Sequence, residues 1–193
     1  MRSAEITRKT KETDIYANFV IDGGGLSTIN TGIPFFDHML DSFVRHGRFD
    51  LTLTVTGDLN TGPHHTVEDT GIVLGLSFLK ALGDGRGIER FSNISVPMDE
   101  SRADVIIDIG GRPYLVFDGF FSGPVEGVID PWLVRHFFES FVQNAKITAH
   151  MEVKGSSDHH KCEALFKSFG RALRYASGLT DQNGTIPSTK GVL

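Results

Sequence analysis

The stretch HHTVED at residues 64–69 decides how this chain is organised, because a similar stretch, HHKCEA at residues 159–164, begins 95 positions later (159 − 64 = 95). Both contain the pattern HHxxE, and both open segments with apolar residues at helical spacing. On a helix the first histidine and the glutamate are four residues apart and share a face. Imidazole and carboxylate ligands suit Mn, Fe or Zn. One HHxxE motif is weak evidence for a metal site, but two copies at two helix starts predict one.

The repeat extends upstream of the paired histidines. DHMLDSFV at residues 37–44 aligns with RHFFESFV at residues 135–142, at an offset of 98 (135 − 37 = 98). Each half is therefore predicted to contain a helix with one histidine, then a strand, then HHxxE at the start of a longer helix. Six of the eight histidines belong to this pattern. The candidate metal ligands are His38, His64, His65, Glu68, His136, His159, His160 and Glu163.

The division of these ligands between two metals stays open at this point. Symmetry suggests that each metal takes one lone histidine, one His–Glu pair, and a histidine from the other motif. A set of eight ligands then leaves positions for substrate and water, which distinguishes a catalytic metal site from a closed structural one.

Periodicity and turn residues predict an α/β (α+β) fold made of two pseudo-symmetric βββαβα half-domains, with mixed sheets packed against helices. We expect strands at 4–9, 13–21, 26–29 and 51–55, with helices at 35–45 and 65–82. The second half is expected to have strands at 88–96, 103–109, 114–117 and 147–153, with helices at 132–144 and 159–177. The glycine-rich segment 83–87 is the expected boundary, so that half-domains 1–86 and 87–193 together form one compact domain. The second ends in a polar tail, 178–193, which in isolation has the composition of a disordered segment, although its Ser-Thr-Lys-Gly cluster can also bind phosphate.

Composition limits the possible function classes. The chain has 193 residues, 39% hydrophobic and 22% charged, as is typical of a globular protein. Its formal charge of −5 and its lack of a basic run argue against a nucleic-acid partner. The single cysteine, Cys162, excludes an internal disulfide and is expected to be a helix-packing residue. We expect a cytoplasmic protein, because neither a signal peptide nor an apolar run of about 18 residues is present.

Several stretches resemble the imidazoleglycerol-phosphate dehydratase family: GIPFFDHML at 32–40, HG at 46–47, both HHxxE regions, GGRP at 110–113 and HFF at 136–138. The resemblance runs from Arg8 to Lys190. It implies the dehydration of D-erythro-imidazole glycerol phosphate to imidazole acetol phosphate in histidine biosynthesis, through a metal-bound imidazolate and a diazafulvene. It further implies a ribosomal protein S5 domain 2-like fold, two Mn²⁺ per active site (other divalent metals are possible), and a homo-oligomer of 24 subunits with active sites between subunits.

The resemblance also implies roles for individual residues. Glu12 matches the family's acid/base position, and His46 is a second candidate near the substrate. The residues that match the phosphate-binding positions are Arg90, Arg112, Lys167, Ser188, Thr189 and Lys190. Without the resemblance, Glu12 is better interpreted as a surface strand residue, His46 as a helix-end cap, and the two arginines as solvated side chains.

Other interpretations stay open. A dinuclear hydrolase would use the same ligands to activate water. A ferritin-like storage shell is less compatible, because such sites favour carboxylates on four long helices. Asp69 and Asp99 are candidates for orienting the histidines or for simple capping. His150 has alternating strand neighbours and is expected to be a packed or exposed strand histidine.

Overall fold

The computed structural model describes residues 1–126, 128–180 and 184–193. The first half contains β1 (Ser3–Lys9), β2 (Thr13–Val20), β3 (Ser27–Asn30), α1 (Pro34–Gly47), β4 (Asp50–Gly57), η1 (Leu59–Thr61) and α2 (His64–Leu82). The second half contains β5 (Phe91–Met98), β6 (Ser101–Asp108), β7 (Tyr114–Gly119), α3 (Pro131–Ala145), β8 (Thr148–Lys154) and α4 (Asp158–Ala176). Every predicted helix and strand is present, with ends within about three residues of those expected. The short helix η1 was not predicted.

The largest shift of an element start concerns β5, which begins at Phe91 rather than at Ile88. Arg90 has a φ of 74°, in the left-handed region, and this conformation interrupts an extended strand. Ile88 instead forms an isolated bridge with Leu179. The segment before β5 is therefore tied to the chain that follows α4.

Each half forms a four-stranded mixed sheet, and the two sheets have the same topology. Their strand orders are β1-β2-β4-β3 and β5-β6-β8-β7. In both, the first three strands in that order pair antiparallel and the fourth pairs parallel. On β2 the buried residues Ile15, Ala17 and Phe19 alternate with more exposed ones, as a sheet with one covered face requires. The predicted duplicated α/β fold is confirmed.

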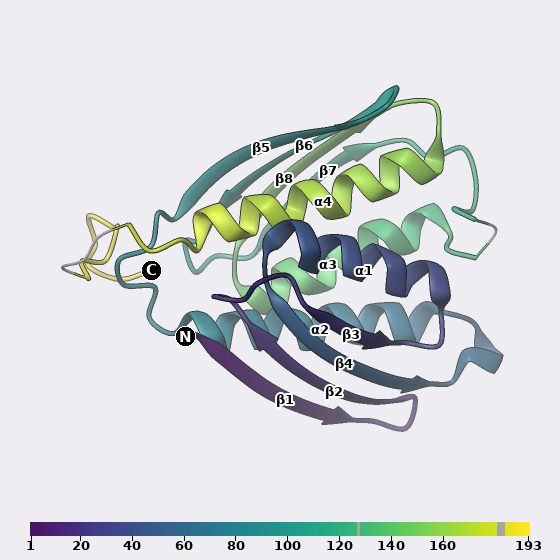
Figure 1. Cartoon of the computed structure of the whole chain (residues 1–193), viewed down its shortest axis with the longest axis horizontal. Coiled ribbons are helices and arrows are strands. Elements are labelled where there is room, and N and C mark those ends of the chain that lie inside the picture. The colour runs from purple at the N-terminus through teal and green to yellow at the C-terminus, as the bar shows by residue number, and fades with distance from the viewer. Residues whose placement is uncertain (127, 181–183) are drawn as a thin grey trace.

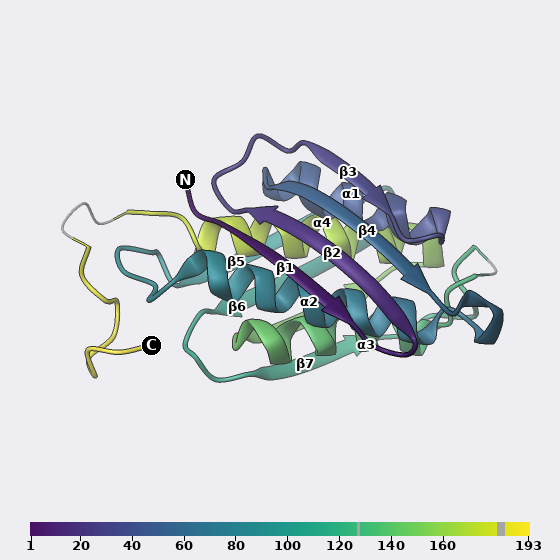
Figure 2. The same cartoon turned by 90° about the horizontal axis from the view of Figure 1, so that it is seen from below.

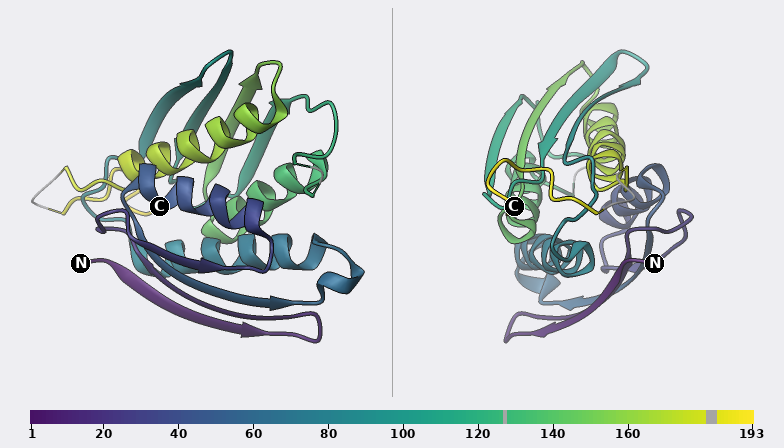
Figure 3. Two further views of the ribbon diagram at one scale, coloured as in Figure 1. Left: turned by 45° about the vertical axis from the view of Figure 1, so that its right-hand side comes forward. Right: turned by 90° about the vertical axis from the view of Figure 1, so that its left-hand side faces the viewer.

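The four helices lie between the two sheets (Figures 1 and 3). In the first half α2 packs on β1 and β2 and α1 on β3; in the second, α4 packs on β5 and β6 and α3 on β7. Across the middle, α1 contacts α4 and α2 contacts α3. Figure 2 shows the first sheet in front of these helices. Each helix of one half is thus packed against a helix of the other.

Phenylalanines and glycines make this central contact tight. Phe43 of α1 lies 5.8 Å from Phe169 of α4 and 6.1 Å from Phe141 of α3, measured between ring centroids. A Cβ added to Gly75 of α2 would lie 2.5 Å from the Phe141 carbonyl oxygen, closer than real Cβ atoms approach. A Cβ added to Gly170 of α4 would come even closer to the Phe43 carbonyl oxygen of α1. Only glycine allows these backbones to approach so closely.

The C-terminal tail is hydrogen-bonded to the start of the second half in the residues that the structure describes. Thr180 N–H donates to the Gly87 carbonyl, and Gly87 N–H donates to Thr185. The helices of the described ranges include none that is long and apolar enough to cross a bilayer. We propose that residues 1–86 and 87–193 are half-domains of one compact domain, because their helices share the central contact.

Candidate metal centre

The first group of candidate ligands joins helices of different halves. His64 and Glu68 lie one turn apart at the start of α2, and His136 comes from α3. His64 Nε2 is 3.3 Å from one Glu68 carboxylate oxygen, and His136 Nε2 is 3.5 Å from the other. One ligand atom from each residue lies within 4.8 Å of the others. The contact between α2 and α3 therefore creates the group.

The second group repeats this arrangement with the halves exchanged. His159 and Glu163 lie at the start of α4, and His38 comes from α1. His159 Nε2 is 3.2 Å and His38 Nε2 is 3.7 Å from one Glu163 carboxylate oxygen. These ligand atoms also lie within 4.8 Å of one another. Each group thus contains a lone histidine from one half and a His–Glu pair from the other.

The remaining two candidate ligands lie outside both groups. His65 Nδ1 is 3.0 Å from an Asp58 carboxylate oxygen, and its Nε2 is 3.7 Å from Glu12. His160 Nδ1 is 2.8 Å from a Glu100 carboxylate oxygen. The hydrogen bond to Asp58 raises the pKa of His65, and that to Glu100 raises the pKa of His160. In return, His160 lowers the pKa of Glu100 to about 2.

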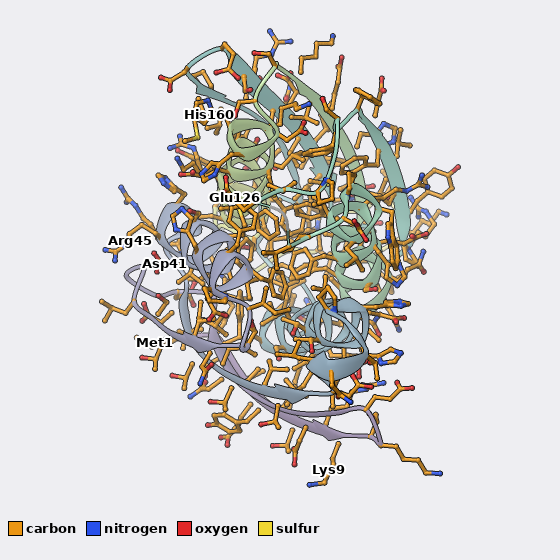
Figure 4. The ribbon with its side chains drawn as sticks, turned by 90° about the vertical axis from the view of Figure 1, so that its right-hand side faces the viewer. Met1, Lys9, Asp41, Arg45, Glu126 and His160 are labelled. Atoms are coloured by element: carbon orange, nitrogen blue, oxygen red, sulfur yellow. The ribbon has the colours of Figure 1, made fainter. Side chains whose placement is uncertain are left out.

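A carboxylate also orients one histidine within the groups. His159 Nδ1 lies 2.7 Å from Glu126, whereas His136 Nδ1 lies 3.7 Å from Glu139, beyond hydrogen-bond distance. A carboxylate at Nδ1 fixes the tautomer and leaves the Nε2 lone pair for a metal. Figure 4 looks onto this end of the molecule and labels Glu126 and His160. Asp58, Glu100 and Glu126 were not among the predicted site residues. Only folding brings Glu100 and Glu126 to the helix starts, whereas Asp58 lies seven residues before His65.

The two groups fit divalent metal ions. Metal–nitrogen distances are about 2.1 Å, so ligands of one ion lie about 4 Å apart or closer, near the observed spacing. Each group offers two imidazoles and one carboxylate, a set that suits Mn, Fe or Zn. Three protein ligands leave coordination positions open, as catalytic sites do.

The two groups differ in their surroundings. Lys167 Nζ is 2.6 Å from Glu163, as their four-residue spacing predicts. Burial is the largest single influence and opposes ionisation of Glu163, but the hydrogen bond and charge of Lys167 together with His38 and His159 outweigh it, so the pKa of Glu163 is lowered. The position four residues after Glu68 is Ile72, which offers no charge. Instead the Trp132 ring lies 4.9 Å from His64, centroid to centroid.

Two further candidates for orienting the histidines have different positions. Asp69 is buried and binds the Thr13 hydroxyl at 2.5 Å and Arg8 at 2.6 Å. Asp99 is exposed, and its carboxylate lies 3.9 Å from His160 Nε2. Asp69 therefore stabilises the sheet-side of α2, while Asp99 faces the second HHxxE motif.

The two acid/base candidates lie in different places relative to the groups. The Glu12 side chain is 53% exposed and is held by no short hydrogen bond in the described residues. His46 lies two turns after His38 on α1, and burial, followed by the charge of Lys167, lowers its pKa. It lines a cavity of about 560 Å³ with Arg48, Arg171 and Arg174.

Five of the six predicted phosphate-binding residues line one cavity of about 380 Å³. They are Arg90, Arg112, Ser188, Thr189 and Lys190. Arg90 Nε donates to Asp108 at 2.8 Å, and its Nη1 donates to the Pro187 carbonyl at 2.7 Å, so it anchors the tail. Lys167 is the exception, because it lies beside Glu163 and not in this cavity.

The cavity and the second ligand group lie at opposite ends of α4. Arg90 N–H donates to the carbonyl of Ala176, the last residue of α4, whereas His159 is in its first turn. At 1.5 Å per residue these positions are roughly 26 Å apart along the helix axis. Figure 1 shows the C-terminus and the helix starts at opposite sides of the molecule.

Two other residues take the places expected for them. His150 lies on β8, exposed, between Ile106 and Val116 on the neighbouring strands. Cys162 is 1% exposed in the core, and burial raises the pKa of its thiol, so it is not a ligand of either group.

Comparison with known proteins gives a consistent result. The family model described as imidazoleglycerol-phosphate dehydratase matches residues 31–173. Relatives of that name from Methanospirillum hungatei and Methanoculleus marisnigri are 69% and 56% identical, over 100% of this chain and of each relative. The crystal structure of imidazoleglycerol-phosphate dehydratase from Staphylococcus aureus has a TM-score of 0.83 and 37% identity, covering 92% of this chain and 99% of that chain. The structure from Pyrococcus furiosus has a TM-score of 0.84 and 34% identity, covering 97% and 100%. The chain therefore belongs to the imidazoleglycerol-phosphate dehydratase family of hydro-lyases.

Proposed function

We propose that this chain dehydrates D-erythro-imidazole glycerol phosphate to imidazole acetol phosphate in histidine biosynthesis. The observation that carries the proposal is the pair of His–His–Glu groups, each assembled from both halves of a chain that belongs to this family. We further propose that each active site uses two Mn²⁺ ions, although the same ligands suit other divalent metals.

The reaction removes a hydroxyl group as water from the carbon next to the imidazole ring and a proton from the adjacent carbon. The resulting enol becomes the ketone. That C–H proton is weakly acidic, because no carbonyl group is adjacent to it. Divalent ions held by the two groups would make the N–H of the substrate's imidazole ring more acidic, and the electron density of the deprotonated ring can expel the neighbouring hydroxyl.

Glu12 is the proposed acid/base for this proton transfer. Its carboxylate is exposed on the turn between β1 and β2 and lies 3.7 Å from His65 Nε2, at the same end as the ligand groups. An exposed carboxylate beside the ligands can exchange its proton with a bound substrate. His46, two turns from His38 on α1, is the second candidate.

The geometry of one chain supports a site shared between subunits. The ring-binding groups and the cavity lined by Arg90, Arg112 and Lys190 lie at opposite ends of α4. A three-carbon chain between imidazole and phosphate cannot cover the roughly 26 Å between them. We therefore propose that the phosphate cavity of one subunit serves the ligand groups of its neighbour, in a cytoplasmic shell of 24 subunits. Lys167, beside Glu163, would bind the phosphate from the ligand side.

Turnover of imidazole glycerol phosphate tests the proposal directly. The protein is stripped with a chelator, dialysed, and assayed with and without added Mn²⁺. We expect activity only with the metal and none on phosphate esters without an imidazole ring. His64→Ala should lose activity, while the matched control His150→Ala, an exposed histidine outside both groups, should keep it. Metal-independent turnover, or equal activity of both variants, would contradict the proposal.

A further inference from the structure

The turns β1–β2 and β5–β6 occupy equivalent places in the duplicated fold. Glu12 and Glu100 are each the residue directly before the second strand of their hairpin. The next residues also correspond: Thr13 pairs with Gly57 on β4, and Ser101 lies against Gly155 after β8. Glu12 and Glu100 are therefore equivalent carboxylates at the metal end.

The residues after the paired glycines correspond as well, but their chemistry differs. Asp58 follows Gly57, and Ser156 follows Gly155. In the first half Asp58 accepts from His65 Nδ1 at 3.0 Å. In the second half Ser156 offers no carboxylate for the equivalent histidine, His160.

Glu100 supplies the carboxylate that Ser156 lacks. Its Oε2 accepts from His160 Nδ1 at 2.8 Å. Its Oε1 accepts from Ser157 N–H and from the Ser101 hydroxyl, both at 2.8 Å. Both carboxylate oxygens of Glu100 therefore already accept hydrogen bonds. One of these bonds holds Ser157, the N-cap residue of α4. Among the residues that the structure describes, Glu12 has no such partners, and its side chain is 53% exposed.

We propose that Glu100 is a positioning residue that orients His160 as a metal ligand. The equivalent carboxylates of the two hairpins, Glu12 and Glu100, would then have different roles. In the first half Asp58 orients the histidine and Glu12 is left for proton transfer. In the second half Glu100, the counterpart of Glu12, orients the histidine and is therefore not free for that role. The inference rests on the proposed metal-dependent function and identifies the residue that prepares one ligand.

Metal affinity is the appropriate measurement, because a residue that orients a ligand acts on binding before any turnover. Removing such a partner typically weakens metal binding 10–100-fold. We therefore expect Glu100→Ala to bind Mn²⁺ about 10–100-fold more weakly. The assay titrates the intact protein with Mn²⁺ and measures the unbound ion by its electron paramagnetic resonance signal. The matched control is Glu12→Ala, which should change Mn²⁺ affinity less than about threefold while abolishing turnover.

A rescue variant separates positioning from a general effect on stability. In Glu100→Ala/Ser156→Asp the carboxylate stands where Asp58 stands in the first half. We expect it to recover most of the Mn²⁺ affinity, which a purely structural loss at the turn would not allow. If Glu100→Ala does not fold, Glu100→Gln keeps an acceptor for Ser157 N–H, loses the charge, and should bind Mn²⁺ several-fold more weakly.

The outcomes are distinguishable. Wild-type affinity in Glu100→Ala or, where that variant does not fold, in Glu100→Gln overturns the inference and leaves the proposed function standing. Failure of Ser156→Asp to restore binding to the folded Glu100→Ala variant also overturns it. If the wild-type protein itself binds no Mn²⁺, the proposed function fails, and the inference fails with it.

Discussion

Replacing Gly75 by alanine should damage one metal group through the helix contact that builds it. The added Cβ would lie 2.5 Å from the Phe141 carbonyl oxygen, whereas ordinary contact begins at 3.4 Å. Helix α2 must therefore move from α3 by as much as 0.9 Å (3.4 − 2.5 = 0.9). Glu68, two turns before Gly75, would move with it, away from His136. The present Nε2–carboxylate separation of 3.5 Å would grow to as much as 4.4 Å (3.5 + 0.9 = 4.4), beyond the roughly 4 Å that two ligands of one ion span.

The change in stability is the difference of two opposing effects. Overpacking costs about 1–3 kcal/mol, and replacing a helical glycine by alanine contributes about 1 kcal/mol of helix propensity. We expect a net loss of about 0–2 kcal/mol in the free energy of unfolding, or a fall in Tm of up to about 8 °C for a chain of this size. The larger effect should be on Mn²⁺ binding at the group made by His64, Glu68 and His136.

The assay is a Mn²⁺ titration of Gly75→Ala combined with thermal unfolding of the metal-free protein. Gly170→Ala tests the other group in the same way, because Gly170 of α4 lies against α1. Gly123→Ala is the control, since a Cβ there meets no atom within 4 Å among the described residues. Parental Tm and full Mn²⁺ affinity in Gly75→Ala would refute the idea that this close approach holds the group together.

Four further predictions follow from the site. Glu12→Gln should keep its Mn²⁺ content and lower kcat by about 100-fold or more; normal turnover would remove Glu12 from the mechanism. Arg112→Ala and Lys190→Ala should mainly raise KM, and an unchanged KM in both would place the phosphate elsewhere. Chelation should reduce the particle mass measured by light scattering, because an ion bound only by the assembly stabilises it; an unchanged mass would exclude a bridging metal. Trp132, the only tryptophan, should lose fluorescence when Mn²⁺ binds beside His64 and His136, and an unaltered spectrum at saturation would count against occupancy there.

The sequence predicts the elements well, because they depend on local patterns. Two periodicities and one repeat are enough for the order of strands and helices and for His38, Glu68 and Glu163 as candidates. The sharing of ligands between halves depends on α1 meeting α4 and α2 meeting α3, which is a long-range packing result. The start of β5 was placed too early, because the left-handed backbone at Arg90 leaves no hydrophobic signal.

The carboxylates around the histidines also could not be predicted from local sequence patterns. Glu126 and Glu100 lie 33 and 60 residues from the histidines they contact, whereas Asp58 lies seven residues before His65 in an irregular segment. Nothing in their local composition distinguishes them from solvated acids. Comparing the two halves does provide a signal: Glu100 is the counterpart of Glu12, and Ser156 is the counterpart of Asp58. An internal alignment of the hairpins would have found both pairs.

The exchange of ligands between halves has an evolutionary consequence. An ancestral chain of half this length would have carried a lone histidine and a His–Glu pair that could not meet within one molecule. Two copies related by a twofold axis would have formed two identical sites, as any isologous pair must. In a fused chain the two copies of a position can mutate independently, so that identity is no longer required. Lys167 follows Glu163 by four residues, whereas the corresponding residue after Glu68 is Ile72, so the two copies of this position already differ. Selection can tune one ion's environment while leaving the other's intact.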